Sequence, residues 1–221
     1  MSEAVTGRQS KPYHHRRLRE AVIEAALTEI QAVGAARISM REIARRAGVS
    51  HAAPAHHFGD KRGIFTAIAT EGFKLLRQGN EPSIGDPAAL LKGGLGYISF
   101  AVNHPAHFEV MFRPDLYDNE DEELRAARDA AFDVLYRAVE QGLGSANADD
   151  VLGTSMAAWS FVHGFAALLL GGNFPTDLTA DPDGFASHVV AGMISMARIT
   201  GAQAASGLPS MESLGITFPS Q

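Results

Sequence analysis

The chain of 221 residues contains no cysteine, which excludes disulfide bonds, thiolate metal sites and cysteine nucleophiles. It also lacks G-x-S-x-G, H-E-x-x-H, the P-loop and the G-x-G-x-x-G dinucleotide motif. Ser160 and His163 are close in sequence, but no acidic residue is placed to orient the histidine. His104, His107 and His163 have no acidic partner at a spacing that indicates zinc or nickel. The sequence therefore predicts a protein that is not an enzyme, with no catalytic residues, metal or cofactor.

Signals for secretion are absent from the first 20 residues, so we expect a cytoplasmic protein. One run without charge, Val151 to Leu170, has the length of a membrane span. Its flanks are acidic, at Asp149, Asp150 and Asp177, and no Lys/Arg cluster anchors either end. A helix that is apolar on every face can be buried between its own core and a second subunit. We therefore expect a homodimer interface here and no membrane span.

The charge is distributed unevenly along the chain. The formal net charge is −6, which by itself argues against binding to nucleic acid. However, residues 1–62 carry 11 Lys/Arg against 6 Asp/Glu, whereas the remainder carries 8 against 19. The pattern indicates a basic module that can neutralise phosphates, attached to an acidic body.

Helix signals recur along the chain and strand signals do not. Apolar residues from Leu18 to Val33 share one helical face, and Gly34 follows as a stop. Pro105 separates two helices, the second being short and running to Phe112. Capping patterns that open further helices occur at Ser39, Ser50, Asp60, Asp86-Pro87, Asn119 and Asp181-Pro182. We expect an all-α fold with about nine helices.

Four segments follow from these patterns. Residues 1–15 form a basic arm, which either enters a minor groove or is a solubilising tail. Residues 16–62 form a basic helical domain, and residues 63–200 form an acidic helical domain; the family resemblance described below implies DNA binding for the first and ligand binding and dimerisation for the second. The last segment, residues 201–221, is rich in Gly, Ser, Ala and Pro and is expected to be irregular.

The strongest functional signal is SMREIARRAGVSHAAPAHHF, from Ser39 to Phe58. It consists of two short helices joined at Gly48, which is the helix-turn-helix pattern. Ala44 and Gly48 are small where the helices must cross closely. The second helix offers only alanines, Pro54 and Phe58 for burial, so it must face something other than the core. The alternative is a plain αα-hairpin, but the basic flanks favour DNA.

These residues resemble the DNA-binding domain of the TetR family of bacterial transcriptional regulators. The similarity covers the helix from Arg16, then ISMREIARRAGVS and HHFGDKRGIF. It places Ser39, Ala47, Gly48, Val49, Ser50, Phe58 and Lys61 at the family's pattern positions. Many family members have Lys-Gly-Thr-Leu-Tyr where this chain has His51-Ala52-Ala53-Pro54-Ala55. Ala55 stands at the usual tyrosine and cannot replace it as a phosphate contact.

The C-terminal half also resembles one branch of that family. Trp159-x-x-x-His163-Gly164 is similar to a Trp…His-Gly signature, and HPAHFEVMFRP (His104 to Pro114) is similar to the helix 6 region of the same branch. The resemblance implies a homodimer whose last two long helices form a four-helix interface. It also implies a repressor that a small, apolar effector releases from a near-palindromic operator. An enzyme with an accessory DNA-binding head and an architectural protein without a ligand are the alternatives.

Candidate DNA contacts lie at helix N-termini, on the second helix and at its end. They are Ser39, Arg41, Ser50, His51, Ala52, Ala53, His56, His57 and Lys61. His51 can hydrogen-bond a base or phosphate, and Ala53 can touch a thymine methyl group. The two serines can bind phosphate at a helix N-terminus, or act as caps alone.

Candidate effector contacts are the aromatic and apolar residues of the second domain. They are Tyr97, Phe100, Phe108, Met111, Phe112, Phe132, Tyr136, Trp159 and His163. The alternative is that most of them are core residues, because a ligand pocket is lined by the same residue types. A closed apolar cavity would favour an effector-binding regulator over an architectural protein.

Overall fold

The computed structural model of the chain describes residues 11–81, 85–86, 88–144, 147–181, 184–193 and 195. Their regular structure is helical, with eight α-helices, one short 3-10 helix and a further helical segment at residues 184–193. None of these residues lies in a strand, which confirms the all-α prediction. The chain divides into two compact units, Met1–Asn173 and Phe174–Gln221. The predicted tail at residues 201–221 lies outside the described residues.

The N-terminal head of the first unit consists of α1 (Lys11–Val33), η1 (Ala35–Arg37), α2 (Met40–Arg46) and α3 (Ala53–Phe58). α1 begins five residues earlier than predicted, so residues 11–15 of the expected arm are helical. Its inner face buries Val22, Ala26 and Ile30. α1 ends as predicted at Gly34, whose φ of +81° favours glycine.

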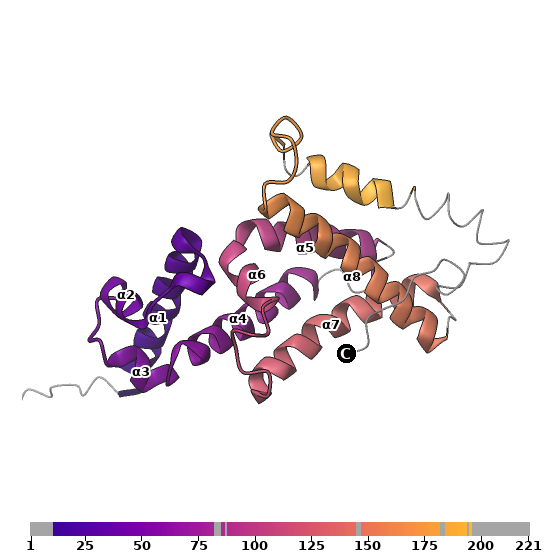
Figure 1. Cartoon of the computed structure of the whole chain (residues 1–221). Coiled ribbons are helices and arrows are strands. Elements are labelled where there is room, and N and C mark those ends of the chain that lie inside the picture. The colour runs from indigo at the N-terminus through magenta and orange to yellow at the C-terminus, as the bar shows by residue number, and fades with distance from the viewer. Residues whose placement is uncertain are drawn as a thin grey trace, which may run out of the picture. The chain divides into compact units, whose positions relative to one another are not determined.

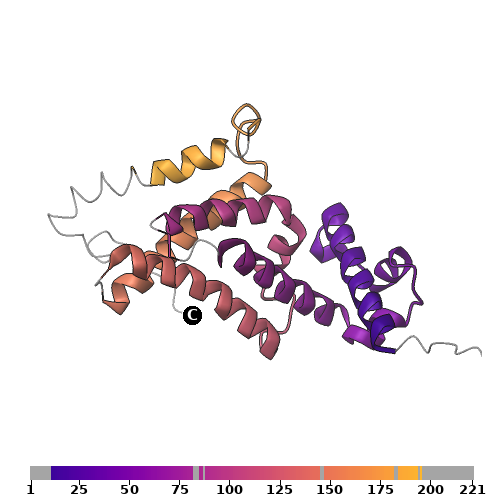
Figure 2. The same ribbon diagram turned by 180° about the vertical axis from the view of Figure 1, so that it is seen from behind.

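α4 (Lys61–Asn80) runs from the head into the helical body of the same unit (Figures 1 and 2). Asp60 caps it by accepting a hydrogen bond from the Gly63 backbone N–H at 3.0 Å. A Cβ atom at Gly63 would lie 2.0 Å from the Phe58 carbonyl oxygen, so only glycine fits this turn. Ile64, Phe65 and Ile68 are fully buried on α4. This helix packs against helices of both the head and the body and forms the spine that connects them.

The body contains α5 (Ala89–Asn103), α6 (Pro105–Met111), α7 (Glu122–Leu143) and α8 (Ala148–Leu170), and α4 packs against α5, α6 and α7. The expected cap of α7 at Asn119 is wrong. The Asn119 side chain donates to the Pro114 carbonyl instead, and Asp121 accepts from the Leu124 N–H at 2.8 Å. The turn before α7 uses Asn119 internally, so the helix begins later.

α8 buries one side and exposes the other. Val151, Val162 and Phe165 are buried within the unit, whereas Leu152 and Leu168 are each 47% exposed. By length and composition alone, α8 is apolar enough to cross a membrane. Its buried face shows that it also packs as a core helix of this unit.

The second unit contains the helical segment at residues 184–193. Asp181 caps it as predicted, since its carboxylate accepts from the Gly184 N–H at 3.0 Å. Ala186 and Val190 are buried. The apolar stripe that the sequence predicts for this helix is Phe185, Val189, Met193, Met196 and Ile199. Its first three residues are half-buried, and Met196 and Ile199 lie outside the described residues.

Candidate nucleic-acid interface

α2 is held by its cap and by a small, buried inner face. Ser39 accepts a hydrogen bond from the Glu42 N–H at 3.2 Å, as the capping pattern predicts. Ile43 and Ala44 are fully buried where α2 packs against α1. Arg41 is on the exposed side of the helix. Ser39 and Arg41 are therefore fixed in position and open to solvent.

The turn after α2 has the geometry that the sequence indicated. Gly48 adopts a φ of +66°, and the Val49 N–H donates to the Ala44 carbonyl at 3.1 Å. Only glycine enters this left-handed region without strain. The turn closes α2 and directs the chain into α3, as in a helix-turn-helix.

The start of α3 differs from the prediction, because Ser50 is not its cap. The helix begins at Ala53, its N-cap is Ala52, and no side chain caps it. A helix capped by Ser50 would place Pro54 in the interior, where its ring would clash with the Ser50 carbonyl and its missing N–H would leave that carbonyl unpaired. The chain instead forms a turn from Ser50 to Ala53, with the Ala53 N–H bonded to the Ser50 carbonyl at 3.0 Å.

This turn and the outer side of α3 form an exposed surface with few large side chains. Ser50, His51, Ala52 and His56 are exposed, whereas Ala53 is half-buried. Pro54 is fully buried and fixes the first turn of α3 against the head. Small side chains leave room for a close approach from outside, and His51 and His56 are the polar side chains of this surface.

The arginines around α2 separate into paired and unpaired side chains. Arg45 forms an ion pair with Glu42, and the Arg46 Nε atom lies 2.5 Å from the buried carboxylate of Glu29 on α1. Among the described residues, Arg41 has no such ion pair. Arg46 therefore joins α2 to α1, and Arg41 is the guanidinium of this helix that remains available.

Lys61 is a predicted DNA contact, but its side chain is half-buried and packs within the head. Its ammonium group is 3.5 Å from the Ala36 carbonyl and 3.4 Å from the Ile38 carbonyl, and it sits over the Phe65 ring. It thereby ties the start of α4 to the segment that leads into α2.

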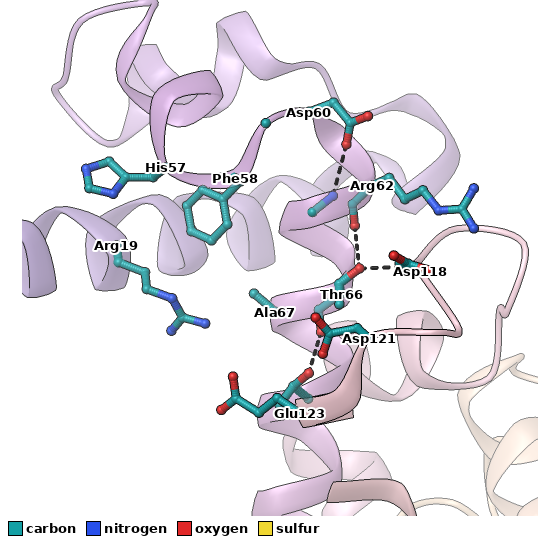
Figure 3. Close-up of a pocket in the computed structure, with 13 residues that line it drawn as sticks. Arg19, His57, Phe58, Asp60, Arg62, Thr66, Ala67, Asp118, Asp121 and Glu123 are labelled. Carbon is teal, nitrogen blue, oxygen red and sulfur yellow. Dashed lines mark hydrogen bonds between the residues drawn. The ribbon is translucent and has the colours of Figure 1, made fainter. Parts of the chain in front are cut away.

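A polar cavity of about 490 Å³ lies where the head meets the body (Figure 3). His57, expected to contact DNA, is half-buried and lines this cavity with Phe58. Across it, the Thr66 hydroxyl donates to the Arg62 carbonyl and accepts from the Asp118 N–H at 3.0 Å. Sequence reasoning missed Thr66 and Asp118, because they are 52 residues apart and carry no motif.

Five of the nine candidate effector contacts gather in one aromatic cluster of α5, the α6 region and α8. They are Tyr97, Phe108, Phe112, Trp159 and His163. The His163 ring stacks on Phe108 with centroids 5.2 Å apart, and it meets Phe112 edge-on at 4.5 Å. The Trp-x-x-x-His spacing thus places both side chains on the same side of α8.

The other four candidates have different surroundings. Phe100 contacts the His104 ring at 5.2 Å, and Met111 is fully buried. Phe132 and Tyr136 pair with each other on α7, and the Tyr136 hydroxyl donates to the Ala148 carbonyl at 3.3 Å. None of the nine residues lines the cavity of Figure 3, so that cavity is separate from the predicted effector residues.

The Tyr97 hydroxyl connects the two residues of the α8 signature. It lies 2.8 Å from Nδ1 of His163 and accepts from Trp159 Nε1 at 3.4 Å. Burial raises the pKa of Tyr97 and lowers the pKa of His163, so both groups are neutral near pH 7. Trp159 can only donate to the Tyr97 oxygen, so the single Tyr97 proton is free for Nδ1; when it is donated there, the imidazole proton is on Nε2.

We expect lowering the pH from 7.5 to 5.5 to reduce the free energy of unfolding. Burial lowers the pKa of His163 and of His104, while a histidine in the unfolded chain titrates near ~6.5. The unfolded state therefore binds more protons below that pH, and stability falls as pH falls. Urea unfolding at both pH values measures this. His163→Gln should reduce the pH slope, and an unchanged slope would exclude His163 as a contributor.

The fold and this surface define a class of protein: a helix-turn-helix transcriptional regulator with a DNA-binding head and a helical body. Residues 22–68 match the family model described as bacterial regulatory proteins, tetR family. Residues 90–193 match the model of the tetracyclin repressor-like C-terminal domain. The chain belongs to the TetR family of bacterial regulatory proteins. This confirms the helix-turn-helix and family predictions, while the Trp…His-Gly branch remains a prediction.

Known relatives are similar along most of the chain. An uncharacterized HTH-type transcriptional regulator of Mycobacterium tuberculosis is 24% identical over 158 residues, which is 70% of this chain and 71% of the relative. A solved protein of unknown function from Rhodococcus sp. RHA1 is 27% identical, with a TM-score of 0.66 over 85% of this chain and 96% of that chain. NalD of Pseudomonas aeruginosa, the secondary repressor of the MexAB-OprM multidrug efflux pump, is 21% identical, with a TM-score of 0.58 over 83% and 96%. The domains are those of regulators and not of enzymes.

Proposed function

We propose that this chain is a cytoplasmic repressor that binds a near-palindromic operator as a homodimer and is released by a small molecule. The observation that carries the proposal is the exposed surface of α2 and α3 on a head whose spine, α4, continues into the body. That body contains an aromatic cluster with an internal hydrogen-bond relay. A change in the body therefore has a direct structural route to the head.

The DNA contacts are proposed on the side of the head formed by α2, the turn and α3. Ser39, Arg41, Ser50, His51, Ala52, Ala53, His56, His57 and Lys61 are the candidates. Arg41 and the N-terminus of α2 meet phosphate oxygens, and His51 reaches a base edge. Lys61 acts by holding the segment before α2, and half-buried His57 supports α3 from behind. Because the α3 surface offers few base contacts, affinity depends mainly on phosphates and DNA shape.

The effector is proposed to be a small apolar molecule with one hydrogen-bond acceptor. Tyr97, Phe108, Phe112 and Trp159 provide apolar surface, and when Tyr97 donates to Nδ1, His163 keeps an Nε2–H that can donate to the effector. Phe100, Met111, Phe132 and Tyr136 complete the candidate set. NalD, whose name describes a repressor of an efflux pump, has a similar fold. An apolar effector that separates these rings would change the position of α6.

Homodimerisation is proposed through α8 together with the helical segment at residues 184–193. Beyond Asp149 and Asp150 in its first turn, the exposed side of α8 carries Leu152, Ala157, Ser160 and Leu168 and no charge. Small side chains between the two leucines let a partner helix approach closely. A dimer of this kind presents two heads to successive major grooves.

The test is selection of bound sequences from random duplex DNA by the full chain. We expect an inverted repeat whose half-site centres lie roughly 34–36 Å apart, or a multiple of that spacing. Addition of a cognate effector should then release this DNA. Enrichment of a single half-site would contradict the dimeric operator, and no enrichment at all would contradict sequence-specific binding.

Two head variants separate base reading from positioning. His51→Ala should change the preferred base at one operator position, by about 1–3 kcal/mol. Lys61→Ala should weaken binding to all sequences to a similar degree, because it loosens the segment before α2. Competition binding against the single-substituted operators measures both. Arg137→Ala on α7, which removes another exposed cation, is the matched control and should change neither.

A further inference from the structure

One partly buried hydrogen bond joins the body to the DNA-binding head at its first turn. The backbone N–H of Ala35 donates to the Glu109 side chain at 2.9 Å, across 74 residues of sequence. Ala35 is fully buried. As the first residue of η1, its N–H has no partner within that helix, and a buried N–H without a partner is strongly unfavourable. Glu109 on α6 satisfies it.

The segment that receives this bond sets the position of α2. η1 ends at Arg37, Ile38 follows, and Ser39 caps α2. Lys61 of α4 holds the carbonyl groups of Ala36 and Ile38. In the segment that leads into α2, Ala35 is thus held by a carboxylate from α6, and Ala36 and Ile38 are held by an ammonium group from α4.

The other end of the connection lies in the aromatic cluster. Glu109 follows Phe108 directly on α6, a helix of only seven residues. Phe108 stacks on His163 of α8 and meets Tyr97 edge-on at 6.1 Å. Adjacent residues on a helix point about 100° apart, so Phe108 faces the cluster while Glu109 faces the head. A rotation of α6 that moves one side chain must move the other.

We propose that Glu109 is the positioning residue that couples the aromatic cluster to the DNA-binding head. The cluster sets the orientation of α6, and the Glu109 carboxylate transmits that orientation to Ala35 and so to α2. This inference rests on the proposed function, since it assigns the route by which an effector changes the head. Glu109 itself contacts neither DNA nor effector.

The first test is hydrogen exchange at the Ala35 amide in the full chain without DNA or effector. In Glu109→Ala we expect exchange to rise at least ~10-fold, because a charge-assisted hydrogen bond is lost. Glu109→Gln, whose side-chain carbonyl still accepts, should restore much of the protection. The fully buried amide of Ile68 in α4 reports global unfolding, and Glu140→Ala on the exposed side of α7 is the matched control. Unchanged protection of Ala35 in Glu109→Ala would overturn the proposal.

A double-mutant cycle with His163→Ala then tests the connection. We expect His163→Ala to accelerate Ala35 exchange beyond that of Ile68 in the wild-type background, and to add nothing in the Glu109→Ala background. Equal acceleration at both amides, or additive effects at Ala35, would overturn the proposal. These readouts need no effector. If the cycle gives the expected non-additive exchange at Ala35 but no effector releases the selected operator DNA, the proposed function is rejected and the coupling through Glu109 is retained.

Discussion

Raising the KCl concentration from 50 to 200 mM is expected to weaken operator binding by about 10³-fold. The expectation follows from the composition of the head surface, where small residues leave phosphate contacts as the main source of affinity. Three phosphate contacts on each protomer release about six counterions, and the logarithm of the binding constant then falls by about 0.9 per contact for each tenfold rise in salt. Fluorescence anisotropy with the selected operator at several salt concentrations measures the slope.

Arg41 provides the matched test of that prediction. It is exposed, and no ion pair occupies it among the described residues, so Arg41→Gln should reduce the slope by about two, one contact for each protomer. Arg45→Gln removes a charge on the same helix that Glu42 already neutralises, and its effect should be smaller. A dissociation constant that changes less than about threefold over this salt range would reject the phosphate-contact interpretation.

Placing a charge on the exposed face of α8 is expected to abolish the dimer. Leu168 is 47% exposed within the described chain, and in the proposed interface it becomes buried against the partner. Leu168→Glu would force an unpaired carboxylate into that contact, which is strongly unfavourable. Because two linked heads bind far more tightly than one, operator affinity should fall by about 10²- to 10⁴-fold.

Sedimentation at micromolar concentration and operator binding should change together in Leu168→Glu. The control is Leu91→Glu, which adds the same charge at another exposed leucine, on α5. It should leave both measurements close to the wild type. A Leu168→Glu protein that remains dimeric would show that this face of α8 is not the subunit interface.

Much of the head was predictable because its signals are local. A capping serine three residues before a glutamate, and a glycine where the backbone needs a positive φ, act over a single turn. Ser39, Gly48 and Asp60 therefore have the roles that the sequence indicated. Ser50 does not, because Pro54 removes the N–H that a helix capped there would require. That exclusion is also local, because Pro54 lies four residues after Ser50.

The body was predictable in kind and less so in detail. Proline and capping signals placed α5 and α6, the run without charge placed α8, and the Trp-x-x-x-His spacing placed Trp159 and His163 on one side of α8. The sequence did not separate the five residues of the aromatic cluster from Phe132 and Tyr136, because the spacing of aromatic residues along a helix does not show which rings are in contact. Asn119 misled in the same way, because its side chain completes the preceding turn.

The sequence by itself determined the all-α class, the helix-turn-helix and the family, since each depends on residue types at fixed short spacings. Only the tertiary structure decided which distant groups meet: Glu109 with the Ala35 amide, Thr66 with Asp118, and Tyr97 with His163. A buried polar group needs one partner, and many side chains along the chain can supply it. The choice among them follows from how α4 and α6 pack, and no local pattern encodes it.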